Sequence, residues 1–477
     1  MGYTAIWWVR RDLRLADNQA LSAAAEGGRP VLPLFVLDPA LLRSPYVGAK
    51  RLAFLLEGLR SLDRDLRAIG SRLVVRHGSP AQVLRSVVAE CGAQAIFAEE
   101  DYSPYARRRD SIVARHLPLH LMGGLTVHPP QALLKANGEA YVVFTPFSRA
   151  WQALPAPNKD DLLPPPERLD TPEAVSSQSL PALPRLPEPL PIRAGEAEAQ
   201  RRLRAFCAGE GGKAPLVHRY AQTRDRLDLD GTSLLSPYLR FGMLSARQAL
   251  VAARQALETA PSPDSAHGVA AWIRQLIWRE FYLAILAHFP EARQRALRTQ
   301  MQGIPWQNDA AQFEAWCAGR TGYPVVDAAM RQLAATGTMH NRARLVAASF
   351  LVKDLLIDWR WGERWFMQHL IDGDPAANNG GWQWVAGTGT DAAPYFRIFN
   401  PVSQALKFDP EGNYVRRWLP ELAGVPRAFV HQPWRMPLDV QLASGCRIGL
   451  DYPAPITDHR ESRQRALAAY ARARQHG

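Results

Sequence analysis

Short apolar runs alternate with helix-like patterns over the first 130 residues. The runs are rich in Val, Ile, Leu and aromatic residues, as strands buried in a parallel sheet are. Between two of them, leucines recur from Leu52 to Leu66 at the spacing of one helical face. We expect strands at 4–9, 31–37, 72–76 and 95–98 and helices at 51–69 and 79–90. Strands that alternate with helices predict a doubly wound α/β domain with a parallel sheet over residues 1–130.

A proline-rich stretch then interrupts the pattern. Residues 155–191 contain a run of three prolines at 164–166 and five more between Pro181 and Pro191, which exclude a regular helix or a central strand. We therefore expect an extended connector over residues 131–195, laid on the surface. From residue 196 to 477 the pattern is helical, which predicts an all-α C-terminal domain.

Charge and cysteine content narrow the classes of protein. The net charge of +12 over 477 residues favours a polyanionic partner, with nucleic acid first. A diffuse arginine excess that forms no groove is the alternative, and charge alone leaves both interpretations open.

The four cysteines lie far apart without a CxxC pair, which predicts no metal site and a reducing compartment. Without a signal peptide or a membrane-length apolar run, we expect a cytoplasmic protein with no membrane contact.

The stretch from Asp372 to Gly381 concentrates turn-forming residues. It has too many of them for a helix interior, so we predict a loop whose carboxylates, amides and backbone groups point into one cavity. A calcium loop is excluded, because Ala376 and Ala377 replace the third ligand and the required glycine. An ordinary surface turn is the remaining alternative.

Long motifs make the chain resemble the photolyase/cryptochrome family, and within it the bacterial class I cyclobutane pyrimidine dimer photolyases. Residues 10–18 resemble the opening signature of that family. The other motifs are Trp-Arg-Glu-Phe at 278–281, residues 321–333, Met-His-Asn-Arg at 339–342, residues 373–384 and residues 390–401. The resemblance implies light-driven repair of pyrimidine dimers in DNA, by electron transfer from photoexcited reduced FAD to a flipped lesion. It also implies an α/β antenna domain, a connector and a helical FAD-binding domain, in a monomer that associates with the nucleoid when bound to DNA.

The same resemblance assigns the residues that contact FAD. Thr232 to Ser236 match a segment that cradles the phosphates, where hydroxyls and N–H groups at a helix start suit an anion, although an ordinary helix cap is the alternative. Asn378 matches a residue that faces N5 of the flavin ring, where an amide can donate or accept without imposing charge. Arg344, with Asp372 as its partner, would offset an anionic reduced flavin. The implied FAD contacts are Tyr220, Thr232, Ser233, Leu234, Leu235, Ser236, Trp272, Arg279, Asn341, Arg344, Asp372, Gly373, Asp374 and Asn378.

Catalytic and DNA-binding roles follow from the resemblance as well. Trp272, Gln275 and Arg279 fall on one helical face, which lines the lesion cavity in the family. Aromatic walls there would replace the stacking that an extruded base loses. The implied catalytic residues are Asn378, Trp272, Gln275 and Trp278, with Trp306, Trp359 and Trp382 as an electron-transfer chain that could equally be core aromatics. The implied DNA contacts are Arg224, Gln275, Arg342, Leu345, Arg397 and Lys407.

Three positions depart from the family pattern. Gln275 stands where these enzymes usually have glutamate, so it can keep a hydrogen bond but supplies no negative charge. Leu345 and Thr338 stand in place of methionine and tryptophan. A photolyase of (6-4) photoproducts is the less favoured alternative. Such enzymes need two histidines, and the matching positions of this chain hold Asn341 and Leu345.

Two further expectations concern light capture. Tyr105-Ala106 replaces the Asn-Glu pair of folate-binding members, so Arg10, Arg51 and Asp101 resemble contacts to a second chromophore, a deazaflavin or a flavin, in an antenna pocket that could also be empty. The main rival function is cryptochrome-type blue-light signalling on the same fold. Asn378, and a chain that stops soon after a short basic helix at 462–475, favour repair.

Overall fold

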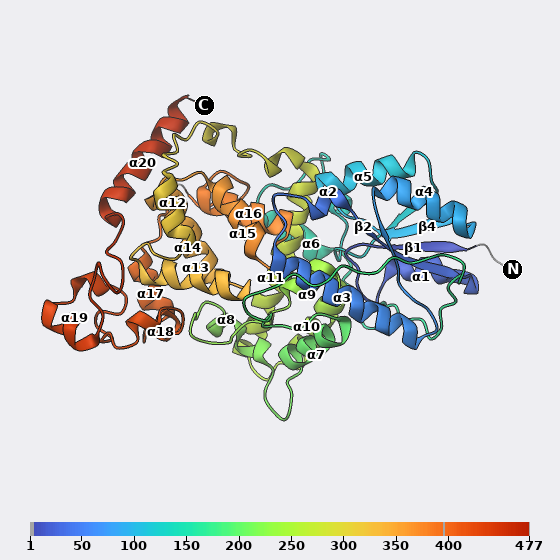
Figure 1. Ribbon diagram of the computed structural model, residues 1–477, viewed down its shortest axis with the longest axis horizontal. Helices are drawn as coiled ribbons and strands as arrows, with labels where there is room; N and C mark the ends of the chain where they lie inside the picture. Colours follow the sequence, from blue (N-terminus) through green and yellow to red (C-terminus); the bar gives the residue numbers. More distant parts are fainter. Residues whose placement is uncertain (1–3, 395, 477) are drawn as a thin grey trace.

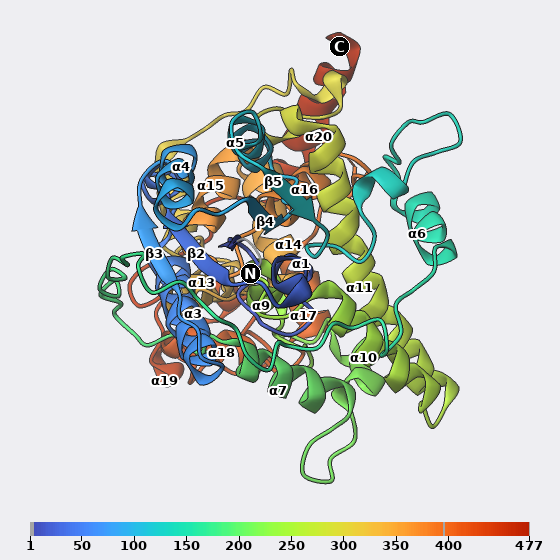
Figure 2. The ribbon, with the colours of Figure 1, turned by 90° about the vertical axis from the view of Figure 1, so that its right-hand side faces the viewer.

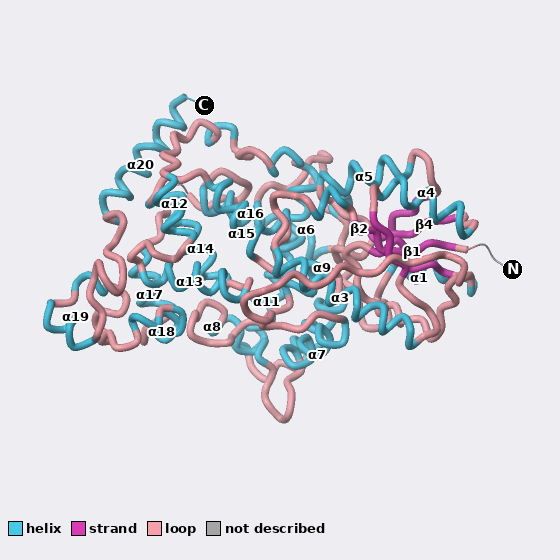
Figure 3. The backbone as a smooth tube through the Cα atoms, viewed as in Figure 1, coloured by secondary structure: helices cyan, strands magenta, loops and turns pink. Residues whose placement is uncertain are grey.

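The computed structural model describes residues 4–394 and 396–476. In these ranges all strands form one parallel sheet of order β3-β2-β1-β4-β5, gathered at the N-terminal end of the molecule (Figures 1 and 3). The strands are β1 (Ala5–Val9), β2 (Val31–Leu37), β3 (Val74–His77), β4 (Ala95–Glu99) and β5 (Leu119–Met122). The four expected strands are confirmed within two residues. The sequence did not reveal β5, because it is a short, half-exposed edge strand without an apolar run.

Alternation along the strands divides the sheet between two cores, which confirms the doubly wound α/β class. Trp7 and Phe35 pack on one face with two helices, and Ile6, Trp8 and Leu34 pack on the other face with two more. The first pair is α1 (Gln19–Ala25) and α3 (Ala49–Ala68), and the second is α4 (Pro80–Cys91) and α5 (Pro104–Ala114). A short helix, α2 (Pro39–Leu42), follows β2.

The connector is less extended than expected. Residues 131–195 include the helix α6 (Phe144–Ala153), because Phe144, Phe147 and Trp151 recur on one helical face that is buried. Between residues 155 and 191, by contrast, the chain contains no helix or strand, as its prolines require. This part follows the edge of the α/β domain.

The rest of the described chain consists of helices and loops, which confirms the all-α half, and the long helix α11 packs against α6, α10 and α16 (Figure 2). No described helix is both long and apolar enough to span a membrane. The main helices are α7 (Glu196–Cys207), α8 (Tyr220–Thr223), α9 (Ser236–Phe241), α10 (Ala246–Glu258), α11 (Pro263–His288), α12 (Ala310–Cys317), α13 (Pro324–Thr336), α14 (Asn341–Ser349), α15 (Trp359–His369), α16 (Pro375–Ala386), α17 (Pro401–Phe408), α18 (Asn413–Trp418), α19 (Leu438–Ser444) and α20 (His459–His476).

The predicted loop from Asp372 to Gly381 is wrong, because most of it belongs to α16. Asp374 caps this helix by accepting hydrogen bonds from the N–H groups of residues 376 and 377, at 2.8 and 3.1 Å. Pro375 occupies the first turn, where its missing N–H costs nothing. A Cβ on Gly380 would lie 2.2 Å from the ring of Tyr282, so this glycine lets α16 pack closely on α11. Turn-forming residues therefore serve here as a cap and a packing surface.

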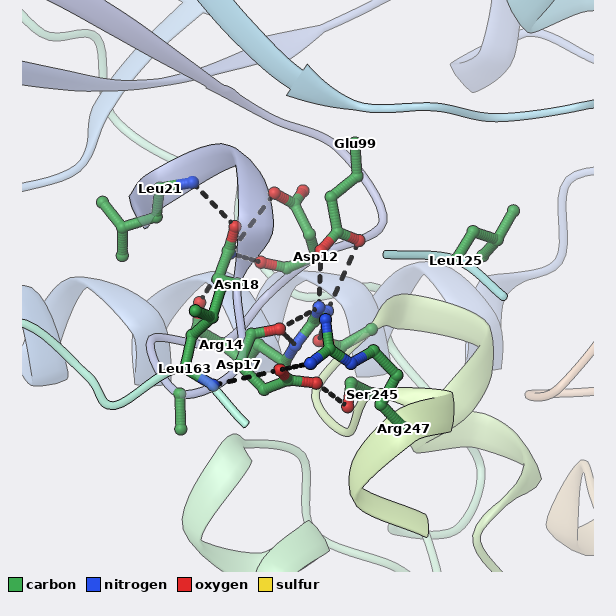
Figure 4. Close-up of polar contacts among 12 residues, drawn as sticks. Asp12, Arg14, Asp17, Asn18, Leu21, Glu99, Leu125, Leu163, Ser245 and Arg247 are labelled. Atoms are coloured by element: carbon green, nitrogen blue, oxygen red, sulfur yellow. Dashed lines mark hydrogen bonds and ion pairs between the residues drawn. The ribbon is translucent and has the colours of Figure 1, made fainter. Parts of the chain in front are cut away.

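The opening motif forms a buried polar network between the sheet and the helices (Figure 4). Arg14 makes an ion pair with Glu99 at 2.5 Å and also donates to the backbone carbonyl of Gly242 beyond α9, at 3.1 Å. Asp17 accepts from the hydroxyl of Ser245, the cap of α10, at 2.5 Å. Burial raises the pKa of Glu99 above its ordinary value, and the charge of Arg14 opposes this shift. The network fixes the α/β domain against the helices that carry the site.

Candidate functional site

One cavity of about 1050 Å³ lies among α9, α11, α14, α16 and the segment before α16. It collects sequence-predicted residues from segments that are far apart in the chain. Those that line it are Tyr220, Arg224, Thr232, Ser233, Leu234, Leu235, Ser236, Trp272, Gln275, Trp278, Arg279, Asn341, Arg344, Leu345, Asp372, Gly373, Asp374, Asn378 and Trp382. Predicted cofactor contacts and predicted lesion contacts therefore share one space.

The segment predicted to hold phosphates touches the segment predicted to hold the flavin ring. The hydroxyl of Ser236 donates to Asp372 at 2.7 Å, and Asp372 accepts two further bonds from Arg344 at 2.9 and 3.1 Å. Leu234 adopts a positive φ of 51° and exposes nearly half of its side chain. For leucine this conformation costs on the order of 1 kcal/mol, which is typical of functional turns. Because α9 has only six residues, its dipole is small, and an anion at this segment would be held mainly by hydroxyl and N–H donors.

Asn378 presents its amide to the cavity in a fixed sense. Its Nδ2 group donates to the backbone carbonyl of Glu363 at 3.0 Å, which leaves Oδ1 as the acceptor on the cavity side. Glu363 is buried and paired with Arg293 at 2.6 Å, and burial raises the pKa of this carboxyl. A rigid acceptor at this wall is suited to a ring N–H.

Asp374 is occupied by protein partners. Besides capping α16, it pairs with Arg11 from the α/β domain at 2.6 Å and lies 3.7 Å from Arg240. Burial alone would raise its pKa, but these two arginines hold the pKa of Asp374 below its ordinary value. Asp374 thus contributes negative charge to the wall while it ties the two domains together.

Two tryptophans on α11 form apolar walls. Trp272 is buried, with its ring centroid 5.1 Å from that of Phe206. Trp278 stacks on Phe144 of α6 with centroids 3.7 Å apart and planes 3° from parallel. The connector helix therefore holds this wall rigid.

The polar residues on the same face of α11 differ in their availability. Gln275 accepts a hydrogen bond from Arg224 at 3.3 Å, so this pair faces the cavity together. Arg279 instead donates to the backbone carbonyls of Leu125 and Leu239, at 2.9 and 3.2 Å. Its guanidinium joins the two domains at the edge of the predicted cofactor site.

His340 is a cavity residue that the sequence did not single out. Its Nδ1 accepts from the N–H of Arg342 at 3.1 Å and caps α14, so Nε2 carries the hydrogen. Within the described chain that buried Nε2 has no partner. Burial lowers the pKa of His340 to about 4, so the ring is neutral at pH 7. Tyr282, Tyr414, Arg417 and Trp418 also line the cavity without any sequence signal, and Trp384 lines it from the motif at 373–384 without an assigned role.

The predicted electron-transfer tryptophans lie in adjoining cores. Trp382 is buried at the cavity wall, with ring centroids 4.9 Å from Phe366 and 6.2 Å from Trp316. Trp359 is buried in the same core. Trp306 is half-buried, and its ring lies edge-on to Tyr470 of α20 at 6.1 Å. Aromatic packing thus extends outward from the cavity, and the electron-transfer role stays a prediction.

Three predicted DNA contacts lie outside the cavity. Arg397 and Lys407 are exposed, the second on α17. Arg342 is half-buried beside the mouth of the cavity, where it pairs with Asp225.

Each predicted antenna residue is paired with protein groups, and Arg10 and Asp101 lie close enough to interact electrostatically. Arg10 pairs with Asp110 at 2.7 Å. Arg51 donates to backbone carbonyls at the end of α15, including that of Leu370 at 3.0 Å, and burial lowers its pKa to about 10. Asp101 accepts from Arg11 at 3.4 Å. All three therefore hold protein groups together. Arg51 contacts the helical domain directly, and Asp101 does so through Arg11, which pairs with Asp374.

Comparison with known proteins agrees with this geometry. Residues 5–168 match the family model described as DNA photolyase, and residues 272–472 match the FAD binding domain of DNA photolyase. The chain is 41% identical to the deoxyribodipyrimidine photo-lyase of Escherichia coli (strain K12), over 99% of both chains. It is 40% identical to that of a Synechococcus strain, over 98% of this chain and 97% of the relative.

Solved structures of similar fold cover nearly the whole chain. A class III photolyase from Agrobacterium tumefaciens superposes with a TM-score of 0.92 at 37% identity, covering 100% of this chain and 98% of that one. A Synechocystis cryptochrome gives 0.89 at 29% identity, with 98% and 99% coverage. A Sulfolobus tokodaii photolyase with two FAD molecules gives 0.82 at 31%, with 98% and 100% coverage.

Proposed function

The chain belongs to the DNA photolyase family, and from that premise we propose that it repairs cyclobutane pyrimidine dimers in DNA, using light and reduced FAD. Relatives named deoxyribodipyrimidine photo-lyase at about 40% identity over full length support the activity. The observation that carries the proposal is the single cavity, about 1050 Å³ in volume, whose walls include both the predicted cofactor contacts and the predicted lesion contacts.

The residues present fit FAD. Hydroxyl and N–H donors from 232–236 suit its phosphates, and the Arg344–Asp372 pair and the Oδ1 of Asn378 suit the polar edge of a flavin ring. When bound, FAD supplies the light absorption and the electron. The protein holds the acceptor of Asn378 at a fixed place, because Glu363 anchors the other end of that amide.

The lesion side of the cavity is built for an extruded pair of bases. Trp272 and Trp278 offer rigid apolar walls that replace the lost stacking, and each stacked base gains about 1–3 kcal/mol on an aromatic platform. Gln275 and Arg224 place an amide and a guanidinium where base edges would lie. Arg342 beside the mouth and the exposed Arg397 and Lys407 suit contacts to backbone phosphates.

The test compares light with darkness. Reduced, FAD-loaded protein is mixed with oligonucleotides that carry either a cyclobutane dimer or a (6-4) photoproduct, and intact bases are measured by chromatography. We expect restored pyrimidines only in light and only from the cyclobutane dimer. Unchanged dimer after illumination, with FAD bound, would contradict repair.

The similarity to a cryptochrome supports one rival function, blue-light signalling. Light-dependent changes of conformation together with no repair of either lesion would favour that rival.

We also propose a second, antenna chromophore of the deazaflavin or flavin type in the α/β domain, and a monomer that acts in the cytoplasm at the nucleoid. The neighbour that holds two FAD molecules supports the antenna. An absorption band beyond that of one FAD, lost on Asp101→Ala, would test it. Size-exclusion chromatography of the loaded protein would test the monomer.

A further inference from the structure

One carboxylate stands between two predicted DNA contacts at the mouth of the cavity. Oδ1 of Asp225 lies 3.0 Å from a terminal nitrogen of Arg342 and 3.9 Å from Nε of Arg224. The side chain of Asp225 is 35% exposed, so it shares the solvent-facing rim with both arginines. Any phosphate that approaches either guanidinium there also approaches this negative charge.

The two arginines face different parts of the site. Arg224 lines the cavity and donates to Gln275, and its guanidinium lies 5.4 Å from the ring centroid of Tyr220. Arg342 lies outside the cavity, with its guanidinium 4.4 Å from the ring centroid of Phe408 in α17. Asp225 therefore links an arginine beside the lesion with an arginine on the backbone-facing rim.

We propose that Asp225 is a specificity-determining residue: it withholds the charge of Arg342 from undamaged DNA and holds Arg224 against Gln275 for the lesion. The inference rests on the proposed function. In the free protein Asp225 neutralises part of the rim, so Arg342 neutralises less phosphate charge and releases fewer cations from the DNA when DNA binds. An undamaged duplex meets mainly the rim, and it gains nothing from Arg224 inside the cavity. An extruded lesion meets the ordered Arg224–Gln275 pair as well.

We expect a substitution of Asp225 to change the affinity for undamaged DNA more than the affinity for dimer-containing DNA. In Asp225→Asn, undamaged DNA should bind about three- to tenfold tighter, since a charge a few ångströms from a phosphate repels it at the protein surface. The slope of log affinity against log salt should steepen by about 0.9, as for one additional phosphate neutralised. Dimer-containing DNA should gain less, because Arg224 loses its anchor beside Gln275. The ratio of lesion to undamaged affinity therefore falls.

Fluorescence anisotropy with FAD-loaded protein, over a series of salt concentrations, tests this with matched undamaged and dimer-containing duplexes. Glu188→Gln in the connector makes the same change of net charge on an exposed side chain and serves as the control. Asp225→Glu should keep the wild-type ratio and slope. Equal gains for both duplexes, or a slope equal to that of Glu188→Gln, would overturn the proposal. Wild-type protein that does not discriminate the dimer at all would instead contradict the proposed function itself.

Discussion

The domain interface and the cavity use the same residue types, arginine with aspartate or glutamate, for different ends. At the interface, Arg14 pairs with Glu99 and donates to backbone carbonyls, and Asp17 accepts from the hydroxyl of Ser245 (Figure 4). In the cavity, Oδ1 of Asn378 and Nε2 of His340 are left facing the space or without a partner. Arg14 and Asp17 are thus satisfied by protein partners, whereas these two cavity groups keep hydrogen-bonding capacity; Nε of Arg247 at the interface also lacks a partner among the described residues. Charged residues by themselves mark neither.

The largest expected effect lies on the scaffold side. Glu99→Ala leaves Arg14 buried without its partner, and breaking a buried pair in this way costs about 3–5 kcal/mol of unfolding free energy. Urea denaturation followed by fluorescence and circular dichroism would measure it. Glu139→Ala removes an exposed pair with Lys135 and should lose far less. Equal losses in the two variants would mean that the interface network contributes no more than a surface pair.

Asp374 belongs to both regions, and its variants separate the two roles. Asp374→Ala removes the cap of α16 and the partner of Arg11, which together cost about 2–4 kcal/mol. Asp374→Asn keeps an acceptor for the cap but removes the charge, so it should lose about half as much. The unfolding free energies of both variants and their FAD content after purification would measure this. If Asn proves as damaging as Ala, the charge matters and the cap does not.

His340 tests the cavity side through pH. Its pKa is about 4 in the folded protein because of burial, while in the unfolded chain it is near the ordinary 6.5. The folded state therefore binds fewer protons between these values, so stability is present above pH 6.5 and falls as the pH drops towards 4. From pH 7 to 5 the loss is about 2 kcal/mol.

His340→Asn keeps an acceptor for the cap of α14 and does not titrate. From pH 7 to 5 the unfolding free energy of the wild type should therefore fall by about 2 kcal/mol relative to that of the variant. A difference that does not change with pH would show that the ring is solvated in solution.

The sequence predicted the scaffold better than the site, for a physical reason. Apolar runs predicted four strands because buried strands consist mostly of apolar residues, whereas the half-exposed edge strand β5 contains no such run. Most of the loop expected at 372–381 proved to be helix α16, and the sequence could not show this because Gly380 packs on Tyr282 from another helix. Resemblance supplied residues that do line one cavity. Asp225 and His340 matched no assigned role, since their importance comes from neighbours that only the fold brings to them.

The smallest expected effect concerns Gln275, one of the three positions that we expect to depart from the family pattern. Its amide oxygen already accepts from Arg224 at 3.3 Å, so Gln275→Glu replaces a hydrogen bond between a charged guanidinium and a neutral amide with an ion pair at a half-exposed position. Such a pair adds about 0.5–1 kcal/mol to the unfolding free energy. We expect the repair yield per absorbed photon to rise as well, because the carboxylate returns a negative charge beside the lesion. Gln275→Ala removes the hydrogen bond and should lower both quantities. If the glutamate variant repairs no better than wild type while the alanine variant repairs worse, the bond to Arg224 suffices, and this cavity works without a carboxylate at position 275.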